Sequence, residues 1–149
     1  MQYDIEYVIP HRGAMRLIDR LLDRDADGIR VGLTVPGDGL FIEPAGMPAW
    51  VGIEYMAQAI AAWAGCRARA AGREPPLGFL LGTRRYEPAL AHFPAGAELV
   101  VEARCEMMGD NGVGAFACRI LLGGEPVAET VVTVFEPPDA KAYLETKTP

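Results

Sequence analysis

The stretch WVGIEYMAQAIAAWAGCRARAAG, residues 50–72, decides the fold that we expect. Most of its residues are good or tolerable helix formers, and Gly72 stands where a left-handed C-cap residue is expected. From residue 53 to residue 66 the only strongly polar side chains are those of Glu54 and Gln58, which are four positions apart and therefore share one face. All other faces are apolar. We therefore predict a long helix that is buried on nearly all sides.

Glu54 is the residue of this helix that most needs an explanation. A carboxylate inside a buried helix is costly unless it is paired or has a chemical role. One interpretation is a structural carboxylate that the helix dipole and a neighbouring hydrogen bond stabilise. The other is a general acid or base. A membrane span fits poorly, because the apolar run is short for a bilayer and Glu54 and Gln58 interrupt it.

The composition argues against several classes of protein. A chain of 149 residues predicts a single domain, residues 1–149, with a sizeable core. A formal net charge of −6 and the lack of a basic cluster argue against nucleic-acid binding. The three cysteines, Cys66, Cys105 and Cys118, are odd in number and far apart, so we expect neither a disulfide framework nor a metal site. The first residues do not resemble a signal peptide, so we expect a cytoplasmic protein.

The rest of the chain predicts strands that cover the helix. Residues 29–35 alternate apolar and polar side chains, and residues 15–23 fit either a helical turn or a strand paired with them. Four further strands are predicted at residues 78–86, 97–108, 113–122 and 126–135, separated mainly by short turns. The expected class is α+β, a long central helix wrapped by an antiparallel sheet. One sheet cannot enclose such a helix, so a second copy or another chain is expected to complete its burial.

Two motifs carry a resemblance to a known family. Ile9-Pro10-His11-Arg12, followed by Leu17-Ile18-Asp19-Arg20, is similar to the Leu-Pro-His-Arg opening and Val-Asp-Arg strand of the hot-dog-fold β-hydroxyacyl-ACP dehydratases. Met47-Pro48 through Glu54-Tyr55-Met56-Ala57-Gln58 resembles the Met-Pro-Gly approach and the Glu-x-Met-Ala-Gln core of their central helix. The likeness covers most of the chain. Residues 50–65 resemble more closely the ApeP-like subgroup, which is encoded with aryl-polyene pigment biosynthesis.

The resemblance implies a hot-dog fold and a reaction. These enzymes remove water from a 3-hydroxyacyl thioester, carried by acyl carrier protein or coenzyme A, to give a trans-2-enoyl thioester in fatty-acid or polyketide-type biosynthesis, without a cofactor. A histidine takes the α-proton, a helix carboxyl group matched here by Glu54 serves the departing hydroxyl, and the two come from different subunits of a dimer. Backbone N–H groups at the helix N-terminus polarise the thioester carbonyl. The implied substrate-binding residues are Leu40, Phe41, Val51, Gly52 and Gln58.

The chain departs from the family at the catalytic histidine. The family's Gly-His-Phe-Pro-Gly loop aligns without gaps with residues 39–43, so Leu40 stands at the histidine position, and leucine cannot move a proton. His11 is the candidate replacement base; its other interpretation is a loop residue bonded to backbone. The sequence around His92 resembles the missing motif, but it follows the helix, so we expect His92 at the surface. We expect Glu43, in the loop before the helix, to be solvated.

Three functions therefore stay open. The leading hypothesis is a 3-hydroxyacyl-thioester dehydratase. The second is a non-catalytic or half-site subunit, which would pair with a histidine-bearing hot-dog protein. The third is an acyl-thioesterase, in which the helix carboxylate would activate water. The product distinguishes them: an enoyl thioester, no product without a partner, or a free acid.

Overall fold

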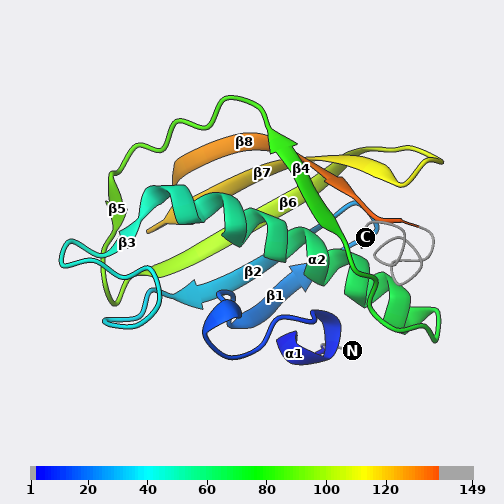
Figure 1. Cartoon of the computed structure of the whole chain (residues 1–149), viewed down its shortest axis with the longest axis horizontal. Coiled ribbons are helices and arrows are strands. Elements are labelled where there is room, and N and C mark those ends of the chain that lie inside the picture. Colours follow the sequence, from blue (N-terminus) through cyan, green and yellow to red (C-terminus); the bar gives the residue numbers. More distant parts are fainter. Residues whose placement is uncertain (1–2, 138–149) are drawn as a thin grey trace, which may run out of the picture.

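The computed structural model of the protein describes residues 3–137, so the predicted single domain extends beyond the described part at both ends. One long helix lies across a strongly curved sheet (Figure 1). The elements of the chain, in order, are α1 (Ile5–Val8), η1 (Gly13–Met15), β1 (Arg20–Arg24), β2 (Gly28–Thr34), β3 (Met47–Pro48), η2 (Ala49–Val51), α2 (Gly52–Ala70), β4 (Phe79–Thr83), β5 (His92–Phe93), β6 (Glu98–Met108), β7 (Val113–Leu122) and β8 (Glu125–Phe135).

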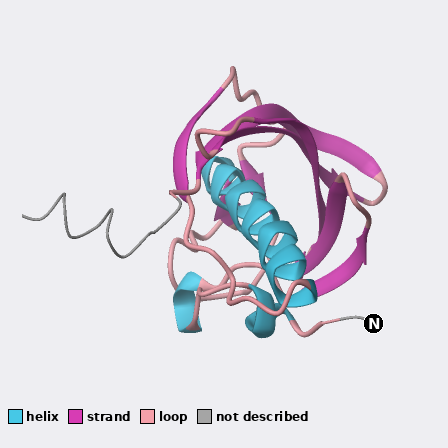
Figure 2. Cartoon of the chain, turned by 90° about the vertical axis from the view of Figure 1, so that its right-hand side faces the viewer, coloured by secondary structure: helices cyan, strands magenta, loops and turns pink. Residues whose placement is uncertain are grey.

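The main sheet has six strands in the order β1-β2-β6-β7-β8-β4, and all its neighbours are antiparallel. It curls around α2, as Figure 2 shows. The predicted antiparallel sheet around a central helix is therefore confirmed. Residues 15–23 contain both structures that the sequence left open, the end of the turn η1 and most of strand β1. The register of β4 against β8 shifts between Leu80 and Gly82, which marks a bulge at a glycine of this strand.

The core lies between α2 and the inner face of the sheet. Tyr55, Met56, Ala59 and Trp63 of the helix are buried there with apolar side chains of the strands, such as Val31, Val101, Phe116 and Ile120. The burial of α2 is not complete. A stripe of side chains stays partly exposed along one side of the helix: Ile53, Glu54, Ala57, Ala61 and Ala64. Among residues 3–137, no helix is both long and apolar enough to cross a membrane.

The short helix α1 packs directly against α2 because Gly65 lacks a side chain. A Cβ atom on Gly65 would overlap the carbonyl oxygen of Val8 and lie 2.7 Å from its carbonyl carbon. Glycine normally weakens a helix by about 1 kcal/mol relative to alanine. Here the close approach of the α1 backbone explains why a glycine stands at position 65. The contact also fixes the segment that leads to His11.

Replacing Gly65 by alanine should therefore destabilise the protein, because the backbone of Val8 must move. We expect the free energy of unfolding to fall by about 1–3 kcal/mol, the usual range for overpacking a close contact. Urea denaturation followed by circular dichroism measures this change. The control is Gly37→Ala, since nothing lies within 4 Å of a Cβ at that exposed position. Equal stability of the two variants would contradict the packing that we describe.

Candidate active site

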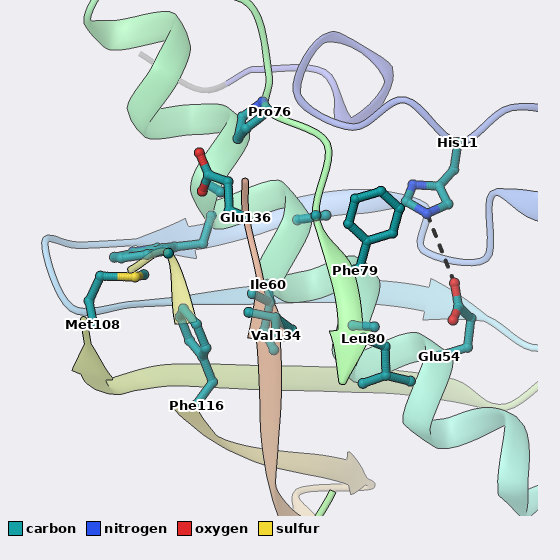
Figure 3. A pocket seen from close by; sticks show the side chains of 16 residues that line it. His11, Glu54, Ile60, Pro76, Phe79, Leu80, Met108, Phe116, Val134 and Glu136 are labelled. Carbon is teal, nitrogen blue, oxygen red and sulfur yellow. Dashed lines mark ion pairs between the residues drawn. The ribbon is translucent and has the colours of Figure 1, made fainter. Parts of the chain in front are cut away.

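A pocket with a volume of about 130 Å³ lies between α2 and β4 (Figure 3). Its helix wall consists of Ala57, Ile60, Ala61, Trp63 and Ala64, and its opposite wall includes Gly78, Phe79 and Leu80. The half-buried stripe of α2 is thus largely the wall of this pocket. Most of the lining is apolar, which is the usual character of a small-molecule site.

His11 and Glu54 lie together at one end of this pocket. His11 precedes β1, and Glu54 lies in the first turn of α2, yet His11 Nε2 and Glu54 Oε1 are 3.9 Å apart. Their side chains are 26% and 39% exposed, so both remain accessible to a ligand. The structure therefore brings together the two residues that the sequence suggests for acid–base chemistry.

The surroundings of His11 favour its neutral form. Burial lowers the pKa of its imidazole below the usual value, and the charge of Arg12 lowers it further, while the Glu54 carboxylate acts in the opposite direction. Nδ1 of His11 is buried and has no hydrogen-bond partner in the described part of the chain. A neutral imidazole at physiological pH can accept a proton, which is what a general base requires.

Arg12 fixes the segment that carries His11. Its guanidinium group donates hydrogen bonds to the carbonyl oxygens of Ile9 at 2.7 Å, His11 at 2.8 Å and Glu6 at 2.6 Å. Three bonds from one planar group hold the turn after α1 in a single shape. The Pro-His-Arg motif is thus a structural unit, in which the arginine sets the position of the histidine.

Gln58 holds Glu54 in place, as Arg12 holds the segment that carries His11. Its side chain is fully buried; Nε2 donates to Glu54 Oε1 at 3.1 Å and to the carbonyl oxygen of Met15 at 2.8 Å. Its Oε1 accepts a hydrogen bond from the N–H group of Leu17 at 2.9 Å. The sequence suggests a substrate-binding role for Gln58. The structure instead places its amide in contacts with the protein, where it orients Glu54 and anchors the loop before β1.

Replacing Gln58 by leucine should damage both stability and activity. The N–H of Leu17 and the carbonyl oxygen of Met15 would lose their partner, and a buried unsatisfied group costs about 1–3 kcal/mol. Glu54 would also lose the donor that orients it. Urea denaturation and a dehydration assay measure the two effects. A leucine variant with the stability and rate of the parent protein would show that Gln58 has neither role.

Gly52 and Val51 contribute to the site through packing and backbone. A Cβ on Gly52 would overlap Tyr86 Oη and lie 2.8 Å from Ile120 Cδ1, so only glycine fits. The N–H group of Gly52 already donates to the carbonyl oxygen of Ala49. The side chain of Val51 is buried in the core. A thioester carbonyl at this helix end would therefore need an N–H group of the preceding turn other than that of Ala49, which donates to the carbonyl oxygen of Ala91.

Leu40 and Phe41 lie in the loop between β2 and β3, away from the Glu54 pocket. Leu40 is 43% exposed and lines a different cavity, next to Tyr55 and Asp19. Phe41 has a positive φ of 70° and packs edge-on against Trp50, with ring centroids 5.4 Å apart. The position of the family histidine therefore does not face Glu54 of its own chain. This agrees with the two-subunit site that the resemblance implies.

The second histidine forms a pair that the sequence did not suggest. His92 Nε2 lies 2.7 Å from Glu43 Oε1, and their side chains are 27% and 55% exposed. Neither residue lines the pocket between α2 and β4. The pair connects the loop before β3 to strand β5. No sequence signal joins two polar residues so far apart in the chain. The His92–Glu43 pair can be compared with the His11–Glu54 pair.

Comparisons with known proteins identify the family and the fold of the chain. A family model described as ApeP-like, the ApeP dehydratases, matches residues 3–145. The solved dehydratase heterocomplex ApeI:P from Xenorhabdus doucetiae contains a chain with 23% identity and a TM-score of 0.89, covering 100% of both chains. A hypothetical thioesterase with coenzyme A from Streptococcus pneumoniae matches with 12% identity, a TM-score of 0.60 and coverage of 78% and 86%. No curated protein matches significantly. The hot-dog fold is therefore confirmed.

Proposed function

The chain belongs to the ApeP-like family of dehydratases and has a dehydratase-like function, and from this premise we propose that it removes water from 3-hydroxyacyl thioesters. The observation that carries the proposal is the 3.9 Å separation of His11 and Glu54 at one end of an apolar pocket. One oxygen atom of a substrate can approach both side chains at hydrogen-bond distance. The apolar walls suit an acyl tail.

The proposed reaction divides the proton transfers between the two residues. Neutral His11 takes a proton from the α-carbon, the bond between the β-carbon and its hydroxyl breaks, and the carboxyl group of Glu54 supplies a proton to the departing hydroxyl to form water. The electron pair of the broken C–H bond becomes the new double bond. His11 is then charged and Glu54 ionised. A proton transfer between these neighbours restores the starting state. No cofactor takes part in these steps.

The carrier of the acyl group and the pathway are proposed from the family rather than from the geometry of the site. We propose that an acyl carrier protein or coenzyme A carries the thioester, and that the pathway is an aryl-polyene or related fatty-acid-type biosynthesis in the cytoplasm. Family membership favours dehydration over thioester hydrolysis, although two solved structures described as thioesterases share the fold.

We also propose that the chain works as a dimer with a related hot-dog protein. Three features support this: the solved relative is a heterocomplex, β4 is an edge strand of the main sheet within the described residues 3–137, and its Leu80 and Leu81 side chains are exposed. A second chain at this edge would bury apolar side chains. Two copies of this chain are the alternative pairing. A partner that carries the family histidine offers a second candidate base besides His11.

The pH dependence of the reaction tests the state of His11. Because burial lowers its pKa below about 6.5 in the folded protein, His11 stays neutral until the pH falls below that value. We therefore expect kcat/KM to hold down to a pH below about 6.5 and to fall as His11 becomes protonated. A rate profile between pH 4.5 and 8 measures this limb. A limb above about 7 would contradict a buried neutral histidine as the base.

The product identifies the reaction. We would incubate the purified chain with a 3-hydroxyacyl thioester of coenzyme A or of acyl carrier protein, and follow both the ultraviolet absorbance of the enoyl thioester and the release of free thiol. Dehydration gives the enoyl signal without thiol. Thiol release without an enoyl product would show a thioesterase and contradict the proposal.

A further inference from the structure

The pocket between α2 and β4 has two ends, which different elements line (Figure 3). His11 and Glu54 lie at one end, and Met108, Phe116 and Glu136 lie at the other. The walls between them are mainly apolar. A thioester whose reacting carbons lie beside His11 and Glu54, and whose acyl tail follows these apolar walls, extends that tail toward Met108.

The dimensions of the pocket limit that tail. Glu54 and Ala64 both line it, and a helix rises about 15 Å over ten residues. The volume is about 130 Å³, slightly less than the roughly 150 Å³ of an apolar cavity that accepts benzene. Such a space suits a short or medium acyl tail. A long chain needs the far end to open.

Met108 is the adjustable side chain at that far end. It is the last residue of β6 and pairs with Gly114 of β7. A Cβ on Gly114 would lie 3.1 Å from Met108 Cε and 3.2 Å from Sδ, so the glycine leaves room for the thioether. Met108 is also 46% exposed, which places it between the pocket and the outside. An unbranched, flexible side chain in this position can shorten or lengthen the pocket.

We propose that Met108 determines the length of acyl chain that the site accepts, by closing the far end of the pocket. The inference rests on the proposed function only in identifying the occupant as an acyl tail. Residues at the reacting end then select the functional group, and Met108 selects the chain length.

Binding of saturated fatty acids tests this without any reaction. The chain has two tryptophans, so Trp50→Phe leaves Trp63, which lines the pocket, as the sole fluorescent reporter. In that background we would titrate fatty acids of four, eight and twelve carbons. Each newly buried methylene tightens binding about fourfold. Met108→Ala should thus strengthen binding of the twelve-carbon acid about tenfold or more and leave the four-carbon acid unchanged. Met108→Phe should weaken binding of the eight- and twelve-carbon acids.

Met107→Ala is the matched control, because the neighbouring methionine is 53% exposed and does not line the pocket. It should leave all three affinities unchanged. The inference is overturned if Met108→Ala changes every affinity by the same factor, or if Met107→Ala gives the same pattern. A length-dependent response without any enoyl product would support Met108 as the length stop and refute the proposed dehydration. Enoyl product without a length-dependent response would support the proposed dehydration and refute Met108 as the length stop.

Discussion

Replacing Glu54 by glutamine should lower kcat/KM for dehydration by about a hundredfold to ten-thousandfold, the usual contribution of a general acid or base. The amide has nearly the same shape as the carboxyl group, and its oxygen can still accept the hydrogen bond from Gln58 Nε2. It cannot, however, donate a proton and return as a carboxylate. The effect should therefore lie in the rate, while the fold persists.

The control for Glu54→Gln is Glu43→Gln. Glu43 also lies beside a histidine, at 2.7 Å from His92, but neither residue lines the pocket. Steady-state kinetics on both variants, with circular dichroism to verify folding, separates the catalytic pair from the surface pair. Equal rates for the two variants would remove Glu54 from the mechanism and leave it as a structural carboxylate of the helix.

Replacing His11 by glutamine should cause a loss of similar size, about a hundredfold to ten-thousandfold in kcat/KM, because the α-proton loses its acceptor. Residues that act as a unit are not additive, so the double variant with Glu54→Gln should be little slower than either single variant. His92→Gln is the matched control and should retain the parent rate. The acidic limb of the pH profile should also change when His11 is absent.

A partner chain makes the His11 result decisive. If the histidine of a related hot-dog protein were the base, His11→Gln would leave the rate of the complex unchanged, while Glu54→Gln would still abolish it. That outcome would assign this chain the carboxyl half of a shared site. A loss of rate in both variants, with the partner present, supports His11 as the base.

The sequence was sufficient for the main elements because they depend on local patterns. The stretch of mainly apolar helix formers that ends at Gly72 predicted α2. Alternation in residues 29–35 predicted β2, and strand patterns separated by short turns predicted β6, β7 and β8. The Pro-His-Arg and Glu-x-Met-Ala-Gln motifs placed His11 and Glu54 among the candidates. That these two residues meet at one pocket is a property of the tertiary structure, since no local pattern brings the segment before β1 to the start of α2.

The remaining features depend on contacts between distant segments. Gln58 bonds the backbone of residues 15 and 17, and Gly65 admits the carbonyl of Val8; neither residue type reveals its partner. Met108 belongs to the pocket only because the sheet curls around α2. The sequence could identify side chains capable of chemistry. It could not show which of them share a cavity.

The most direct test is mass spectrometry of a 3-hydroxyacyl group on acyl carrier protein after incubation with the purified chain alone, comparing the parent protein with His11→Gln. Our account predicts that the parent protein gives a product lighter by one water, and that the variant leaves the substrate unchanged. A parent chain that is inert alone, and that becomes equally active with or without His11 when a histidine-bearing partner is added, would contradict the account.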